Sequence, residues 1–166
     1  MVPNLSQPRS VNVLLNDANW AWPRAVEEIF QPRGVNALLA DTAGDVVRLV
    51  DQNKIHLTIL DISRDEHSGI QTLRMIRKHD PLMPCILLAH RFDTRLLAEA
   101  LLLDAFSVMG KPVDLDLLAG QVDRLFVKYY ASDMFATAGH PKSSTRSNKI
   151  SIRIKSPSRN HDKRKE

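Results

Sequence analysis

Strand-like and helix-like segments alternate five times over residues 11–130 of this chain. Short apolar runs bounded by polar turn residues are typical of strands buried on both faces, and apolar side chains at every third or fourth position are typical of helices. Consecutive parallel strands need a crossover connection, which is usually a helix. The alternation therefore predicts an α/β domain in which five parallel strands form one sheet with helices on both faces.

Each predicted element occupies a short stretch of the sequence. The predicted strands are residues 11–15, 35–40, 56–60, 85–89 and 107–110. The predicted helices are residues 22–31, 43–52, 69–79, 94–103 and 115–130. Pro23 suits the first turn of the first helix, and Asp93 or Thr94 can cap the fourth. Five leucines make a stripe on the fourth helix that is broader than one buried face needs. Two explanations of this stripe are left as alternatives, packing in the core and a surface that binds a partner.

Length and composition suit one globular domain with an appendage. The chain has 166 residues, of which 43% are apolar and 25% are charged. We predict an N-terminal extension at residues 1–10, a domain at residues 11–130 and a basic, disordered tail at residues 131–166. No apolar run is long enough to span a bilayer and no apolar signal region begins the chain, so we expect no membrane insertion and a cytoplasmic location. The single cysteine, Cys85, excludes an internal disulfide and is expected in the core.

The positive charge of the chain is concentrated in the tail. Residues 1–130 hold 14 Lys and Arg against 16 Asp and Glu, whereas residues 131–166 hold 9 against 3, which together give +4. Such a tail can contact phosphates or carboxylates without specificity. Phe135 is its one aromatic residue, so base stacking is poorly supported and nucleic acid is not an expected partner.

Polar residues follow three of the predicted strands at the point where each strand ends. Asp17 follows the first strand, Asp61 the third and Lys111 the fifth. In an open parallel sheet the carboxyl ends of the strands lie at one edge, where ligands bind. Two carboxylates and an ammonium would then meet in one cleft, which is suited to a divalent cation and a phosphoryl group.

Several spacings together resemble those of the receiver domain of two-component response regulators. Asp61 closes the third strand, and Gly69 stands eight residues later, where that family has the glycine that opens its third helix. Lys111 and the proline after it close the fifth strand as the family's Lys-Pro pair does, and Asp17 falls at the second of the family's paired acids. The resemblance covers residues 11–128 and implies a flavodoxin-like three-layer sandwich, with a five-stranded parallel sheet in the order 2-1-3-4-5 and five helices.

The resemblance also implies a role for each residue of the cleft. Asp61 would be the phosphoacceptor, because an ionised carboxylate is a nucleophile that needs no neighbouring base. Mg²⁺ would be held by Asp17, by Asp61 and by the backbone carbonyl of Ser63, since this cation prefers oxygen ligands. Lys111 would pair with Asp61 at rest and bind the phosphate after transfer. The family works in signalling, so we expect no enzyme.

Four positions depart from the family pattern. Asn16 replaces the first of the paired acids and would reach the metal only through a bound water. For charges about 4 Å apart, the lost charge is worth about 1 kcal/mol in water and about 4 kcal/mol at an effective dielectric near 20, so Mg²⁺ affinity is expected to be weakened. Ala89 stands where the family has a Ser or Thr hydroxyl and Val108 where it has a Tyr or Phe, so these two switch positions are degenerate. Asp65 replaces a proline that is common after the phosphoacceptor.

The preferred interpretation is a single-domain response regulator. It would receive its phosphoryl group from a sensor histidine kinase or a phosphotransfer protein, and it would signal through the face made by its fourth helix, fifth strand and fifth helix. The alternative is a pseudo-receiver that binds a partner constitutively and is never phosphorylated, which the residues at 16, 89 and 108 favour. A small enzyme of similar fold is disfavoured, because the chain lacks the glycine-rich phosphate loops of dinucleotide-binding and P-loop proteins.

Overall fold

The sheet and its strand order agree with the prediction. The computed structural model describes residues 10–16 and 20–130. Five parallel strands form one sheet in the order β2-β1-β3-β4-β5. The strands are β1 (Val11–Asn16), β2 (Val35–Ala40), β3 (Leu57–Asp61), β4 (Cys85–Ala89) and β5 (Ser107–Gly110). Compared with the prediction, β1 is one residue longer, β3 is shifted by one residue and the other three strands agree.

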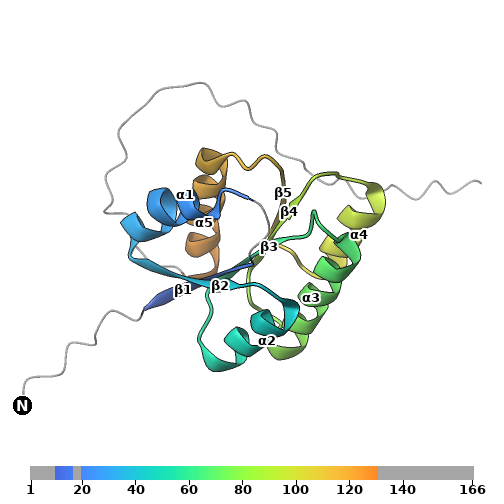
Figure 1. Ribbon diagram of the computed structural model, residues 1–166, viewed down its shortest axis with the longest axis horizontal. Helices are drawn as coiled ribbons and strands as arrows, with labels where there is room; N and C mark the ends of the chain where they lie inside the picture. The colour runs from blue at the N-terminus through green and yellow to red at the C-terminus, as the bar shows by residue number, and fades with distance from the viewer. Residues whose placement is uncertain (1–9, 17–19, 131–166) are drawn as a thin grey trace, which may run out of the picture.

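Helices cover both faces of the sheet (Figure 1). The α-helices are α1 (Trp22–Ala25), α2 (Ala43–Gln52), α3 (Glu66–His79), α4 (Thr94–Leu102) and α5 (Leu115–Tyr130). One face carries α1 and α5, and the other carries α2, α3 and α4. Each face has its own buried apolar cluster, because successive side chains of a strand point to opposite faces and both faces are covered.

The predicted helix at residues 22–31 is present, but it is not one regular α-helix. Only α1 is α-helical there, and it continues as a π-helical turn, η1 (Val26–Phe30), and a 3-10 turn, η2 (Gln31–Arg33). Pro32 has no N–H to donate within a helix, and Gly34 ends the segment in the left-handed conformation with a φ of 66°. A proline followed by a glycine is a helix-ending signal that the apolar pattern alone does not carry.

The start of α3 lies three residues before the predicted one. Asp65 is the N-cap, and its carboxylate accepts a hydrogen bond from the backbone N–H of Ser68 over 3.2 Å. Such a cap satisfies one of the donors that the first turn leaves without a partner. Gly69 therefore lies within the first turn of α3. Asp93 caps α4 in the same way, and α4 ends one residue earlier than predicted.

The register of the strands brings their carboxyl ends together. Asp61 at the end of β3 pairs with Leu88 of β4, and Ala89 at the end of β4 pairs with Gly110 at the end of β5. Asn16 ends β1 on the other side of β3. The polar residues at these strand ends therefore lie close together along one edge of the sheet, the edge formed by the carboxyl ends of its strands.

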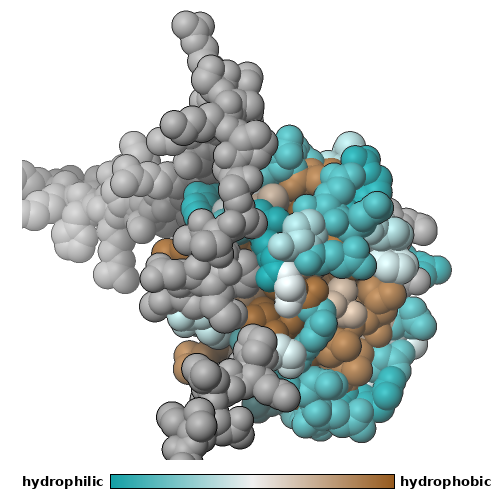
Figure 2. All heavy atoms as spheres, turned by 90° about the vertical axis from the view of Figure 1, so that its left-hand side faces the viewer, coloured by the Kyte–Doolittle hydropathy of each residue, from teal (hydrophilic) through white to brown (hydrophobic). Residues whose placement is uncertain are grey.

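Apolar side chains are divided between the core and the surface. Cys85 is fully buried, as predicted, and burial raises the pKa of its thiol to about 11. In the leucine stripe of α4, Leu96 is buried, whereas Leu101 and Leu102 are 58% and 81% exposed. Core packing thus explains only part of the α4 stripe. Apolar residues also lie between hydrophilic ones on the surface that is seen from the side of α1 (Figure 2).

Three parts of the prediction lie outside the described residues. These are the N-terminal extension, Asp17 and the basic tail. The boundaries of residues 1–10 and 131–166 therefore stay a prediction. None of the described helices is both long enough and apolar enough to cross a membrane.

Gly69 is required by the packing of α3 on the loop that follows β3. A Cβ atom at Gly69 would lie 2.3 Å from Cγ2 and 2.6 Å from Cβ of Ile62. Carbon atoms that pack well are about 3.5–4.0 Å apart, so the added methyl group would displace Ile62. Gly120 in α5 is a matched contrast, because a Cβ atom there would meet no atom within 4 Å.

We expect Gly69→Ala to lower the free energy of unfolding by about 1–3 kcal/mol through overpacking. Gly120→Ala should raise it by about 0.5–1 kcal/mol, because glycine in a helix interior is less favourable than alanine by this amount. Urea unfolding of the two variants measures both changes. Equal stability of Gly69→Ala and the wild type would contradict the close packing on Ile62.

His56 lies at the amino end of the strands, directly before β3 and opposite to the end that carries Asp61. Its Nδ1 accepts a hydrogen bond from the backbone N–H of Asn12 over 3.1 Å, and its carbonyl oxygen accepts one from the Tyr130 hydroxyl over 2.7 Å. An imidazole nitrogen accepts only when it carries no proton. Burial, and after it the positive charge of Lys54, lower the pKa of His56.

We expect the stability of the domain to fall as the pH drops below about 6.5, the ordinary pKa of histidine. The unfolded imidazole takes up a proton there, whereas the folded one does so only at its lowered pKa, so stability is present above this window and lost on acidification through it. Urea unfolding between about pH 5 and pH 8 measures how steeply the free energy of unfolding depends on pH. This dependence should be weaker for His56→Asn, whose side-chain carbonyl can still accept the hydrogen bond from Asn12. His90→Asn, which removes an exposed imidazole, is the control. Equal slopes in all three proteins would rule out this role of His56.

Candidate functional site

Asp61 is a buried carboxylate at the end of β3. Its side chain has no exposed surface, and its Oδ2 accepts a hydrogen bond from Nζ of Lys111 over 2.5 Å. Its Oδ1 accepts one from the backbone N–H of Ser63 over 2.9 Å and another from the Ser63 hydroxyl over 2.5 Å. A buried charge is tolerated when it is paired and hydrogen-bonded. These contacts meet that condition for Asp61.

Lys111 is held at this edge by the strand ladder. Lys111 directly follows β5, and its backbone N–H donates to the carbonyl oxygen of Ala89 over 3.0 Å. Its peptide bond to Pro112 is cis. Its side chain is 6% exposed. Besides the bond to Asp61, Nζ donates to Oγ of Ser63 over 3.0 Å. The side chains of Asp61, Ser63 and Lys111 therefore form a closed triangle of hydrogen bonds.

The Ser63 hydroxyl is a part of the site that was not predicted from the sequence. The prediction gave a role only to the backbone carbonyl of Ser63. A serine two residues after a strand-ending aspartate can turn its hydroxyl back to that carboxylate, as serine does in short turns. The spacing between Asp61 and Ser63 is the signal that could have revealed this contact.

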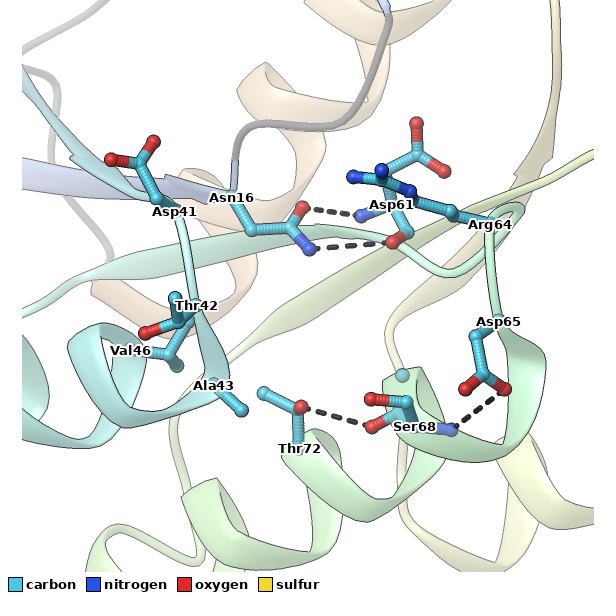
Figure 3. A pocket seen from close by; sticks show the side chains of 11 residues that line it. Asn16, Asp41, Thr42, Ala43, Val46, Asp61, Arg64, Asp65, Ser68 and Thr72 are labelled. Atoms are coloured by element: carbon cyan, nitrogen blue, oxygen red, sulfur yellow. Dashed lines mark hydrogen bonds between the residues drawn. The ribbon is translucent and has the colours of Figure 1, made fainter.

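Asn16 pairs with the backbone of Asp61 across the ends of β1 and β3 (Figure 3). Oδ1 of Asn16 accepts from the N–H of Asp61 over 2.6 Å, and Nδ2 donates to the Asp61 carbonyl oxygen over 3.3 Å. A carboxylate could accept but not donate, so an amide suits this pairing better than an acid. Nε1 of Trp20 donates to the backbone carbonyl oxygen of Asn16 over 3.3 Å. Asn16 therefore holds the peptide of Asp61 in place, and its role beside a metal stays a prediction.

A pocket of about 150 Å³ opens beside Asn16 and Asp61 (Figure 3). Asp41, from the loop before α2, lines one side of it, and Arg64, from the loop before α3, lines the other. Neither residue was predicted from the sequence to belong to the site. Asp41 directly follows the second strand, which is the same kind of position that pointed to Asp61, whereas Arg64 gave no such signal. The pocket therefore has charged groups of both signs next to the buried carboxylate.

The other predicted positions have different outcomes. Ala89 is buried at the end of β4 and brings no hydroxyl to the site. Val108 lies within β5 and packs against the apolar cluster on the side of α2, α3 and α4. Their description as degenerate switch positions stays a prediction. Asp17 falls in the part of the chain that the structure does not describe.

Oxygen donors that suit Mg²⁺ are present at this edge. The carboxylate of Asp61 and the backbone carbonyl of Ser63 are the kind of donor that this cation prefers. Among residues 10–16 and 20–130, no three His, Cys, Asp or Glu side chains are grouped so as to hold a metal ion. The predicted ligand set therefore depends on Asp17, the residue directly after Asn16, for its second carboxylate.

Comparison of the sequence with known families identifies the domain. The family model of the response regulator receiver domain matches residues 13–123. The chain belongs to this family. Receiver domains work in two-component signalling, with histidine kinases or phosphotransfer proteins upstream and output partners downstream. The resemblance drawn from the spacing of Asp61, Gly69 and Lys111 is confirmed.

A curated relative matches over the receiver domain. The transcriptional regulatory protein GlrR of Escherichia coli (strain K12) is 32% identical over 84 residues, which are 51% of this chain and 19% of that protein. The chain thus spans about a fifth of the length of this relative. The match supports the family and carries no activity of the whole relative to this chain.

Solved structures share the fold of this receiver domain. The signal receiver domain of an HD domain-containing protein from Pseudomonas fluorescens Pf-5 has a TM-score of 0.65 at 20% identity, over 75% of this chain and 100% of that one. A response regulator from Thermotoga maritima has a TM-score of 0.61 at 23% identity, over 70% of this chain and 97% of that one. At these identities the likeness shows the flavodoxin-like fold alone.

We expect Asp61 and Lys111 to be energetically coupled. Lys111→Met leaves the Asp61 carboxylate buried without a counter-charge and should lower the free energy of unfolding by about 3 kcal/mol. In an Asp61→Asn background the same change should cost about 2 kcal/mol less, because no buried charge is then left uncompensated. Urea unfolding of the wild type, both single variants and the double variant gives the coupling energy.

The pair of Arg24 and Glu28 is the control for this cycle. Its side chains are 67% and 46% exposed and 2.9 Å apart, so its coupling energy should stay below about 0.5 kcal/mol. A coupling energy of Asp61 and Lys111 no larger than that of the exposed pair would show that the buried contact contributes nothing of its own.

Proposed function

We propose that this receiver domain accepts a phosphoryl group on Asp61 from a phosphohistidine of a sensor histidine kinase or a phosphotransfer protein. The observation that carries the proposal is the buried Asp61 carboxylate with Lys111 at 2.5 Å, at the edge of the sheet where a pocket opens. One carboxylate oxygen attacks phosphorus, so an O–P bond forms. The N–P bond to the donor histidine breaks, and its electron pair leaves with the imidazole.

Lys111 stabilises charge on both sides of this transfer. At rest its ammonium neutralises the Asp61 carboxylate. Once an oxygen of Asp61 carries the phosphoryl group as an acyl phosphate, the negative charge resides on the phosphoryl oxygens, and the ammonium beside them can bind one of these oxygens. A charge that is already in place costs no reorganisation during the reaction, which is how electrostatic catalysis of phosphoryl transfer works.

Mg²⁺ would be held by Asp17, by Asp61 and by the backbone carbonyl of Ser63, with Asn16 reaching it through a water. Receiver domains generally bind Mg²⁺ at this acidic edge. When bound, the cation supplies positive charge that neutralises the phosphoryl oxygens. With an amide in place of one acid, and that amide bonded to the peptide of Asp61, we expect the affinity for Mg²⁺ to be weakened.

The output partner would be a protein that binds the face made by α4, β5 and α5. Support comes from apolar side chains on both of these helices that lie open to solvent, among them Leu102 on α4 and Leu117 on α5, which are 81% and 53% exposed. Because Ala89 and Val108 lack the hydroxyl and the ring of the family switch, the state of Asp61 would reach this face through other contacts. We place this signalling in the cytoplasm and propose that it involves no enzymatic turnover.

A pseudo-receiver that binds its partner without phosphorylation is the second candidate. The specific observation in its favour is that the oxygen and the nitrogen of the Asn16 side-chain amide both form hydrogen bonds to the backbone of Asp61, which suits a fixed structure. Ala89 and Val108 favour it too. In this case Asp61→Asn would leave partner binding unchanged, whereas the phosphoacceptor proposal requires that binding respond to this substitution.

Labelling with a small phosphodonor tests the proposal. Incubation with acetyl phosphate and Mg²⁺ should add one phosphoryl group to the wild type, detected by intact mass, and none to Asp61→Asn. Asp80→Asn, a matched substitution at the far end of α3, should keep the label. If the wild type takes up no phosphoryl group at saturating Mg²⁺ while a competent receiver domain is labelled in parallel, the pseudo-receiver is the correct function.

A further inference from the structure

The Asp61 carboxylate has little room for new ligands. An ionised carboxylate offers about four lone-pair positions. The N–H and the hydroxyl of Ser63 both bond Oδ1, and Nζ of Lys111 bonds Oδ2, so three positions are taken. A cation and an incoming phosphorus atom each need a lone pair on this same carboxylate. At least one of the present donors must therefore leave before both can be accommodated.

The Ser63 hydroxyl is the donor that can leave most easily. The N–H of Ser63 belongs to the backbone two residues after the end of β3, and Lys111 is the buried counter-charge of the carboxylate. The hydroxyl, by contrast, moves away by rotation about a single side-chain bond between staggered rotamers. In the resting arrangement the hydroxyl oxygen accepts a hydrogen bond from Nζ of Lys111 over 3.0 Å, which keeps the hydroxyl turned toward Asp61.

We propose that the Ser63 hydroxyl is a resting-state clamp, a positioning group that competes with Mg²⁺ for the Asp61 carboxylate. This inference rests on the proposed function, and it concerns how Mg²⁺ binding at the same site is regulated. The hydroxyl holds Oδ1 through a 2.5 Å hydrogen bond and must rotate away before a cation and a phosphoryl group can share the carboxylate. Since Asn16 brings no negative charge to attract the cation, the clamp acts on a site with one acid fewer than its family.

A Mg²⁺ titration of the full chain tests the clamp without any phosphodonor. Magnesium chloride is added while tryptophan fluorescence is recorded, because the indole of Trp20 is bonded to Asn16 next to the site. Ser63→Ala removes one net hydrogen bond that the cation must displace, so its dissociation constant for Mg²⁺ should fall about three- to tenfold. Ser63→Thr restores a hydroxyl and should return the dissociation constant to the wild-type value.

Ser107→Ala is the matched control. It removes a buried hydroxyl from β5 that has no hydrogen-bond partner among the described residues, and it should leave Mg²⁺ affinity unchanged. Urea unfolding of each variant checks that it is folded. The clamp is overturned if Ser63→Ala binds Mg²⁺ no more tightly than the wild type, if Ser63→Thr behaves like Ser63→Ala, or if no variant responds to Mg²⁺.

The clamp and the proposed function can fail separately. Labelling of Asp61 in the wild type together with an unchanged Mg²⁺ affinity of Ser63→Ala would overturn the clamp and keep the function. Tighter Mg²⁺ binding by Ser63→Ala together with no labelling of the wild type would keep the clamp and overturn the function.

Discussion

The contact between Asp61 and Lys111 is the interaction on which the rest of this structure depends. A carboxylate with no exposed side-chain surface needs a counter-charge and hydrogen-bond donors to replace the water it has lost. The counter-charge comes from the end of β5, and the carboxylate ends β3, with β4 between them. The sheet must therefore be complete before the charge is balanced, so the site and the fold of this receiver domain stabilise each other.

Substitution of an acid by Asn16 changes what this edge of the sheet can do. An amide both donates and accepts, so Asn16 bonds the N–H and the carbonyl oxygen of Asp61 at once. The backbone of Asp61 is thereby fixed, and the site has one negative charge fewer to attract a cation. The neighbouring pocket adds Asp41 on one side and Arg64 on the other, which keeps the surroundings of Asp61 strongly polar.

Periodicity predicted most of the fold, and it was wrong where local chemistry overrides an apolar pattern. The strands were located to within one residue, because buried parallel strands are short apolar runs with polar ends. The first helix was predicted at residues 22–31, but its turns continue to Arg33, where Gly34 in the left-handed conformation ends them through backbone chemistry that an apolar pattern does not contain. The start of α3 was misplaced by three residues, because the Asp65 side chain caps the helix well before its first apolar residue, Ile70.

The sequence by itself determined the order of the elements, the parallel sheet, the family and the residue types at the strand ends, since these follow from hydrophobic period and spacing. Only the tertiary structure decided that the Ser63 hydroxyl bridges Asp61 and Lys111, that Asn16 bonds a peptide, and that Asp41 and Arg64 share the pocket. Such contacts depend on rotamers and on loop positions that must be correct to a few tenths of an ångström. Residues distant in the sequence acquire that precision only when the sheet and its helices are packed together.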